Sequence, residues 1–333
     1  MNSTLRVIGG FAISVALVGF LLWQIDPAEV AGALGRSRPA LLPLVLVPFA
    51  LDISLRTVRW RILLARDPRP GYRNTFRYLV IGYLANTLLP ARLGELVRAH
   101  LLGTREAVGP TRALGSIAME RGLDVVAAAS LGALASQAAG VPASIVTALG
   151  TLAVAGGLVL IGLAVLPRRF ARRLVDDLVL RAGVGRAARV VHGIGRFAHG
   201  LLDAAEPRRI AVCLVLSLAA WIVTSGVFLV TATSLGIAIS PAAIVACVVA
   251  ANLGAAIPSA PAGVGPYEFG VVIIATSVGL DGPTALAFGL LSHICTTVPV
   301  SVLGAYELSG VRWNLARLRR IGEIAGADMA GEG

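Results

Sequence analysis

Lysine is absent from this sequence, so all 29 basic residues are arginine. We attribute this bias to genome composition. Charged residues make up only 14% of the chain, which is low for a water-soluble protein. The three cysteines, Cys213, Cys247 and Cys295, lie in apolar runs and form no CxxC pair. They are typical of packed small hydrophobic residues and indicate neither a disulfide framework nor a zinc site.

Motifs of catalysis are missing as well. The sequence has no HExxH motif, no Walker loop, no GxGxxG in a strand–helix context and no supported Ser-His-Asp arrangement. We therefore predict no catalytic residues, no metal, no cofactor and a protein that is not an enzyme. No soluble stretch is long enough for a nucleotide-binding or acyltransferase domain, which excludes a self-contained ATP-driven pump. Motifs for nucleic-acid binding are also absent.

Apolar residues, in contrast, are abundant. They make up 56% of the chain, and the mean hydropathy is +0.82. Apolar runs reach membrane-spanning length, so we predict an all-α polytopic membrane protein. The net charge of +11 lies mostly between the runs, which favours contact with an anionic membrane surface over nucleic acid.

The apolar runs divide into continuous and interrupted segments. A cleaved signal peptide is the alternative for the first run, but the run is long for one and lacks a well-placed cleavage site, so we prefer a membrane anchor. We expect about six full transmembrane helices and two interrupted segments that form re-entrant broken-helix hairpins. The full spans are expected at 5–25, 41–64, 111–136, 143–166, 210–235 and 283–307, and the interrupted segments at 82–102 and 244–278.

The arginines predict the orientation in the membrane. With both termini in the cytoplasm and the hairpins entering from opposite sides, 26 arginines are cytoplasmic and only Arg36 and Arg38 are external. We therefore predict a multi-pass protein of the cell (inner) membrane with cytoplasmic termini. The spans and hairpins then form inverted repeats, as in many secondary transporters. The alternative is that both interrupted segments cross fully, which gives eight spans.

One domain accounts for the chain in this interpretation. We predict a single integral membrane domain at 1–320 and a disordered C-terminal tail at 321–333. Between two spans, 167–209 is expected to form cytoplasmic basic amphipathic helices, because Phe170, Leu174 and Leu178 recur at helical spacing between arginines.

The two interrupted segments share a degraded motif. Each reads Asn, a short apolar step, Pro, a small-residue turn, then Gly and Glu. The corresponding residues are Asn86, Pro90, Gly94 and Glu95 in the first segment and Asn252, Pro258, Gly265 and Glu268 in the second. Paired interruptions in two halves of a membrane protein point to a transport site.

The first segment has the chemistry of a phosphate site. Pro90 ends one half-helix, Gly94 permits a tight turn, and the next half-helix begins near the turn with its positive end inside the membrane. Arg92 and Arg98 lie near that end, where a helix N-terminus and guanidinium groups together bind phosphate. The alternative is that Glu95 pairs with one of the arginines and only closes the hairpin.

Two further groups of residues carry unusual polarity for a membrane segment. Glu120, Arg121 and Asp124 share one turn of a span, so they must face a cavity or partners; they complete the arginine cluster or form an internal staple. In the second segment, a regular helix is prevented by Pro258, Pro261 and Pro266 with Gly263 and Gly265 between them. Glu268 either caps the next half-helix or binds a cation or proton. We interpret Asp52 with Arg56 as a simple pair and His293 as a packing residue.

Together, these motifs resemble the flippase-like membrane domain of the lysylphosphatidylglycerol synthetase family, along nearly the whole chain. The resemblance implies movement of a modified phospholipid or another lipid-linked head group between leaflets. Full-length family members add a cytosolic aminoacyl-transfer domain after the membrane part. Because this chain ends at Gly333, we expect the membrane part without that domain.

We therefore predict binding or transbilayer movement (flipping) of a phospholipid or other phosphate-bearing lipid-linked substrate by alternating access. Membrane lipids are the expected partners, together with a separate glycosyl- or aminoacyl-transferase. One alternative is a membrane transferase that acts on a polyprenyl-phosphate or aminoacyl lipid, with Glu95 or Glu268 as general base. Another is a non-transporting membrane partner of a separate transferase.

Overall fold

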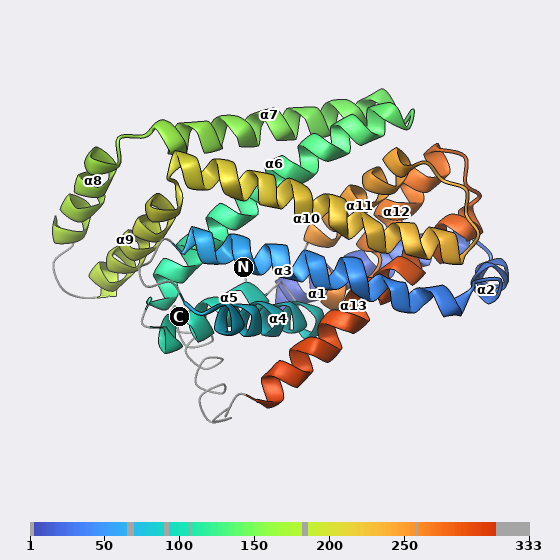
Figure 1. Ribbon diagram of the computed structural model, residues 1–333, viewed down its shortest axis with the longest axis horizontal. Coiled ribbons are helices and arrows are strands. Elements are labelled where there is room, and N and C mark those ends of the chain that lie inside the picture. The colour runs from blue at the N-terminus through green and yellow to red at the C-terminus, as the bar shows by residue number, and fades with distance from the viewer. Residues whose placement is uncertain are drawn as a thin grey trace.

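Helices account for every regular element in the described part of the structure (Figure 1). A computed structural model describes residues 3–64, 70–89, 93–106, 108–181, 186–257 and 259–310. The prediction of an all-α polytopic membrane protein is confirmed. The α-helices are α1 (Ser3–Gln24), α2 (Pro27–Gly35), α3 (Leu46–Leu63), α4 (Tyr72–Leu88), α5 (Gly94–Arg105), α6 (Pro110–Ala138), α7 (Ala143–Val165), α8 (Arg168–Arg181), α9 (Arg186–Ala204), α10 (Pro207–Ser234), α11 (Pro241–Ala256), α12 (Pro266–Ser277) and α13 (Gly282–Ser309). Two short 3₁₀ turns, Pro39–Val45 and Pro261–Gly263, precede α3 and α12.

Four helices in the described residues are long and apolar enough to cross a membrane. They are α7, α10, α13 and the continuous Pro39–Leu63, which includes α3. A fifth candidate is the bent pair Gly9–Gln24 and Pro27–Gly35, whose axes differ by 84°; Asp26 caps its second helix by accepting the N–H of Ala28 at 2.8 Å. The sixth expected span, α6, has 29 residues and is long enough to cross, but it carries the charges of the site. The number of six full spans and their orientation stay predictions.

Both interrupted segments are pairs of helices that turn back on each other. The first pair is α4 with α5, and the second is α11 with α12. Glycine permits their close approach: a Cβ atom on Gly94 would lie 1.9 Å from the carbonyl oxygen of Gly82, and one on Gly270 would lie 2.4 Å from that of Ala250. The two helices of each interrupted segment are thus tightly packed against each other. Their entry sides stay predictions.

The helix contacts fit an internal repeat. Each half has a long helix, a hairpin and a second long helix: α3, α4–α5, α6 and α10, α11–α12, α13. Between the halves, α3 packs on α10, α6 packs on α11, and α13 packs on α4. A two-fold rotation that exchanges the halves maps α3·α10 onto itself and α6·α11 onto α13·α4. The observed pairing is therefore consistent with a two-fold repeat.

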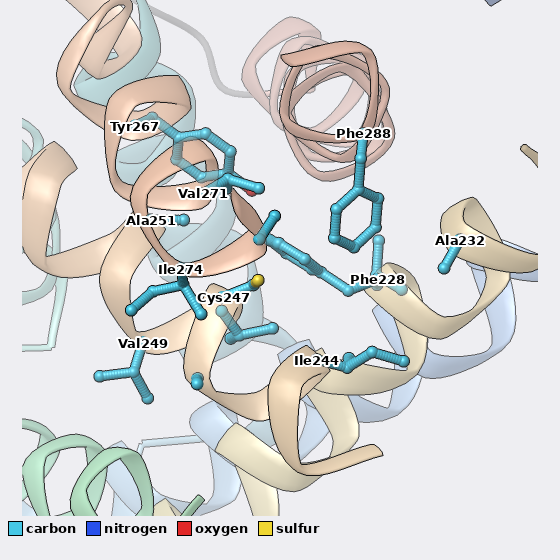
Figure 2. Close-up of a cluster of buried hydrophobic side chains, with 14 of the residues drawn as sticks. Phe228, Ala232, Ile244, Cys247, Val249, Ala251, Tyr267, Val271, Ile274 and Phe288 are labelled. Atoms are coloured by element: carbon cyan, nitrogen blue, oxygen red, sulfur yellow. The ribbon is translucent and has the colours of Figure 1, made fainter. Parts of the chain in front are cut away.

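The largest buried apolar cluster lies mainly in the second half and extends to Ala127 and Ala128 of α6. Figure 2 shows Phe228 of α10 and Phe288 of α13 meeting edge to face, with ring centroids 5.7 Å apart, beside Cys247 of α11. Cys213, Cys247 and Cys295 are all buried, as expected for cysteines that pack as small hydrophobic residues. This core holds α10, α11, α12 and α13 together and shares Trp221 and Tyr267 with the lining of the cavity described below.

The basic stretch predicted at 167–209 contains α8 and α9, which join α7 to α10. Its cytoplasmic location stays a prediction. The expected tail at 321–333 lies outside the described residues.

Candidate functional site

A cavity of about 310 Å³ lies where the two halves meet. Asn86 of α4 and Asn252 of α11, which begin the two interrupted motifs, both line it. The first motif also contributes Glu95, and the second contributes Tyr267. Two segments more than 150 residues apart in the sequence therefore form one site, with walls completed by α3, α6, α10 and α13.

The two asparagines make different hydrogen bonds. Asn86 Oδ1 accepts the backbone N–H of Gly94 at 2.8 Å and so ties the end of α4 to the start of α5. Asn252 Nδ2 donates to the carbonyl oxygen of Val248 in its own helix at 2.8 Å. One amide at the start of α5 is therefore already bonded to the protein and is not open to an anion.

A buried network of ion pairs lies beside the cavity. Arg59 of α3 donates to Asp124, to Glu120 at 3.0 Å and to the hydroxyl of Ser217 at 2.6 Å. Arg98 of α5 donates to the other oxygen of Glu120 at 2.9 Å. Glu120 pairs with three arginines, Arg59, Arg98 and, at 3.1 Å, Arg121. Because Arg59 also bonds Ser217, the network joins α3, α5, α6 and α10.

Arg98 serves this network rather than the cavity. Its side chain is only 1% exposed, its guanidinium lies 4.8 Å from the ring centroid of Trp60, and it is not among the residues that line the cavity. Arg98 was one of the two arginines, with Arg92, that could pair with Glu95 in the first hairpin. It pairs with Glu120 instead. Glu95 instead lies 3.2 Å from Arg121 of α6.

The wall of the cavity carries a second, more accessible set of charges. Arg56 Nε lies 2.9 Å from both carboxylate oxygens of Asp52, and Thr224 of α10 donates to the same carboxylate at 3.1 Å. Arg121 and Glu95 are the most exposed ion pair of the site, with side chains 32% and 28% exposed. Charges that stay near water exchange partners at less cost than the buried ones.

Opposite charges balance among the described residues of the site. There, four arginines (Arg56, Arg59, Arg98 and Arg121) face four carboxylates (Asp52, Glu95, Glu120 and Asp124). This pairing explains how the charges are tolerated inside an apolar helix bundle, where an unpaired ion is very costly.

The second hairpin has its own buried pair. One oxygen of Glu268 accepts the N–H of Gly265 at 2.8 Å, and the other lies 2.5 Å from Nδ1 of His293 on α13. Gly263 and Gly265 have φ angles of +80° and +94°, which glycine adopts without strain. Glu268 thus caps α12, as one of the two interpretations expected. The ring of His293 also stacks on Tyr267 at 4.2 Å, so His293 does more than pack.

The predicted site residues fall into three groups. Those that line the cavity are Asn86, Glu95, Arg121, Asp124 and Asn252. Those that support its walls are Gly94, Arg98, Glu120, Gly263, Gly265 and Glu268. Pro90, Arg92 and Pro258 lie outside the described residues.

Sequence reasoning missed several contributors from other helices. Asp52, Arg56 and Arg59 follow one face of α3 at i, i+4 and i+7, a spacing that was visible and indicates a shared polar surface. Trp221 and Thr224 of α10 also line the cavity, but no pattern in the sequence distinguishes them from other residues of an apolar span.

Comparison with known proteins corrects one expectation. The chain is 29% identical to Glycosyltransferase AglD of Haloferax volcanii, across 86% of this chain and 51% of AglD. The prediction that the protein is not an enzyme is wrong on this comparison, because a protein named as a glycosyltransferase matches most of the chain. The chain spans only about half the length of that relative.

A second relative and a family model agree with the membrane assignment. A UPF0104 membrane protein of Methanothermobacter thermautotrophicus is 30% identical across 34% of each chain. The family model for the lysylphosphatidylglycerol synthase TM region matches residues 7–304, which include both hairpins and every residue that lines the cavity. The chain therefore belongs to the lysylphosphatidylglycerol synthase transmembrane-region family.

Proposed function

We propose that the cavity binds the phosphate-bearing head group of a membrane lipid or lipid-linked substrate and lets it cross between leaflets by alternating access of the two repeats. The observation that carries this proposal is a cavity with charged side chains in its wall, lined by both interrupted segments, inside a protein of a lipid-related membrane family. Transporter sites form at such repeat interfaces. A volume of about 310 Å³ suits a head group, while acyl or polyprenyl tails remain in the bilayer.

Arg121 is the guanidinium best placed to meet the phosphate. Its contact with Glu95 is exposed at the cavity edge, so a phosphate can replace that carboxylate. Arg59 and Arg98 are poor candidates, because their side chains are 0% and 1% exposed and each is held by Glu120 in the interior. The predicted contact from Arg92 stays part of the proposal.

Trp221 adds a donor for a ligand oxygen. It lines the cavity, it is only 7% exposed, and its indole N–H has no hydrogen-bond partner in the described part of the chain. A buried donor without a partner is costly, and a bound head group or water would satisfy it. The site thus offers a cation, an unpaired donor and several carboxylates around one cavity.

Similarity to AglD favours a second candidate, in which this membrane part holds a lipid-linked substrate for group transfer. The cavity would then keep the phosphate of a polyprenyl-phosphate sugar at a fixed depth. Glu95 is the better placed of the two carboxylates considered as a base, because it lines the cavity, whereas Glu268 is bonded to Gly265 and His293.

Reconstitution of the purified protein distinguishes these candidates. Liposomes containing head-group-labelled phospholipids or a polyprenyl-phosphate sugar should show faster movement between leaflets with the protein than without it. Arg121→Gln should slow that movement about tenfold, since a charge-assisted contact is worth roughly 1.5–3 kcal/mol, whereas Arg105→Gln, at an exposed arginine in the last turn of α5, should leave it unchanged. Equal rates for the two variants would reject Arg121 as the contact. Substrate binding that depends on Arg121 without any movement would favour the transfer candidate.

A further inference from the structure

The α8–α9 hairpin joins two membrane spans. Only Leu166 and Pro167 separate α7 from α8, and only Ala205 and Glu206 separate α9 from α10. Each gap of two residues reaches at most about 7 Å, so both ends of the hairpin are held at one face of the membrane. In Figure 1, α8 lies at the outer edge with α9 between it and the other helices.

Packing within the protein covers the inner faces of this hairpin. A Cβ atom on Gly200 of α9 would lie 2.2 Å from the carbonyl oxygen of Arg112, so α9 touches the backbone of α6. Asp203 of α9 joins both neighbours, because it accepts from Arg112 of α6 and, at 2.7 Å, from Arg172 of α8. The hairpin is therefore anchored to the helix that carries Glu120 and Asp124.

The outer face of α8 has no cover within the described residues. Phe170, Leu174 and Leu178 recur at i, i+4 and i+8 and are 64%, 51% and 56% exposed. On α9, Val190 and Ile194 are exposed as well. An apolar row of this kind on a segment tethered at both ends to the membrane is typical of a helix that lies in the interface.

Charge identifies the surface that this face fits. The helix α8 contains five arginines and two aspartates. Arg173 and Arg181 lie three residues after Phe170 and Leu178, hence beside the apolar row, and neither makes an ion pair with any described residue. Asp177, three residues after Leu174, is the one acidic side chain in that stripe. Free guanidiniums beside apolar side chains match lipid phosphates above acyl chains.

We propose that the outer face of α8, with Val190 and Ile194 of α9, binds the surface of an anionic bilayer. Phe170, Leu174 and Leu178 enter the interfacial region, and Arg173 and Arg181 contact lipid phosphates. This surface is separate from the cavity and does not depend on what the cavity binds.

Fluorophore accessibility in the reconstituted full chain tests this proposal. Leu174→Cys and Leu178→Cys are labelled separately with an environment-sensitive dye, because the native cysteines are buried. In bilayers of phosphatidylcholine with phosphatidylglycerol, both positions should be quenched by lipid-attached nitroxide and protected from aqueous iodide. Asp176→Cys, on the opposite side of α8, provides the matched control and should be open to iodide; it breaks only a surface pair with His199.

Charge variants show whether anionic lipid is the occupant. Arg173→Gln with Arg181→Gln should increase iodide access at position 178, whereas Asp177→Asn should decrease it. In phosphatidylcholine alone, protection should be weaker for the parent protein and unchanged by these substitutions. Iodide access at 174 and 178 equal to that at 176 in the anionic bilayer would overturn the proposal and leave this face to a protein partner. Protection that does not depend on lipid charge would also overturn the role of the arginines.

Discussion

At the scale of single residues, the site is a set of ion pairs graded by exposure. Glu120 and Arg59 are completely buried, whereas Arg121 and Glu95 remain near water at the cavity edge. The buried members hold four helices in register, because an ion left alone there is far more costly than a paired one. The exposed members are free to exchange partners, which a binding site requires.

Removing the shared carboxylate of the network should therefore be severe. Glu120→Gln leaves Arg98 without its charged partner and weakens the contacts of Arg59. We expect a loss of about 3 kcal/mol or more in the free energy of unfolding, measured by thermal or denaturant unfolding in detergent. Glu95→Gln, at the exposed edge, should cost less than about 1 kcal/mol. Similar losses for both variants would show that burial does not set their importance.

Trp221 permits a test of binding by its indole N–H. Trp221→Phe keeps an aromatic ring and removes the N–H, which has no hydrogen-bond partner among the described residues; because Trp221 is buried in the core, the smaller ring should also lower the free energy of unfolding, by about 0.5–3 kcal/mol. Affinity for the lipid head group should fall about tenfold if that N–H donates to a charged oxygen. Binding is measured by titration of the reconstituted protein with head-group analogues. Trp23→Phe is the control, because Trp23 is 81% exposed, and a loss equal to that of Trp221→Phe would contradict the assignment.

At the scale of elements, the two hairpins are built by different local means. Asn86 ties α4 to the first amide of α5, whereas Glu268 caps α12 through the N–H of Gly265. The second hairpin also depends on α1, since the hydroxyl of Ser14 donates to the carbonyl oxygen of Val264 at 2.7 Å and accepts the N–H of Ala260 at 2.9 Å. In each case a side chain satisfies backbone groups that the interruption frees, as an apolar environment demands.

The contact between α4 and α5 gives a sharp prediction. Gly94→Ala places a methyl group 1.9 Å from the carbonyl oxygen of Gly82, so the hairpin must open or the helix must shift. We expect a large fall in the unfolding midpoint and loss of head-group binding. Gly150→Ala, in α7 with no atom within 4 Å of the new methyl group, should instead stabilise the protein by about 0.5–1 kcal/mol. An unchanged midpoint for Gly94→Ala would show that the hairpin does not pack as described.

At the scale of the whole molecule, two halves with matching contacts enclose one cavity. The network of Arg59, Glu120 and Ser217 crosses from the first half to the second. Movement of one half against the other must therefore either leave these hydrogen bonds intact or break them together. The accessible pairs, including Arg121 with Glu95, are better suited to change during transport.

Membrane orientation is the prediction that belongs to this scale. With 26 arginines placed in the cytoplasm, a reporter fused after position 320 should be cytoplasmic, and one inserted between 236 and 241 should be external. Cysteine labelling from outside intact cells should fail at position 67. Labelling from outside at any position from 103 to 110 would show that the first interrupted segment crosses fully and would remove the inverted relation of the repeats.

The sequence by itself determined the class of the protein and the location of its two interruptions. Mean hydropathy and the length of the apolar runs require helices in a membrane. The motif that begins at Asn86, and its degraded repeat that begins at Asn252, locate both hairpins. These signals are local: they depend on composition, and on prolines and glycines that interrupt a helix wherever the helix packs.

Only the tertiary structure decided which charges meet. Arg98 and Glu95 are neighbours on one helix, and yet Arg98 pairs with Glu120 and Glu95 pairs with Arg121. Arg59 and His293 acquired their roles from partners on other helices. The reason is physical: the cost of a buried ion depends on its whole surroundings, and those surroundings come from helices far apart in the sequence.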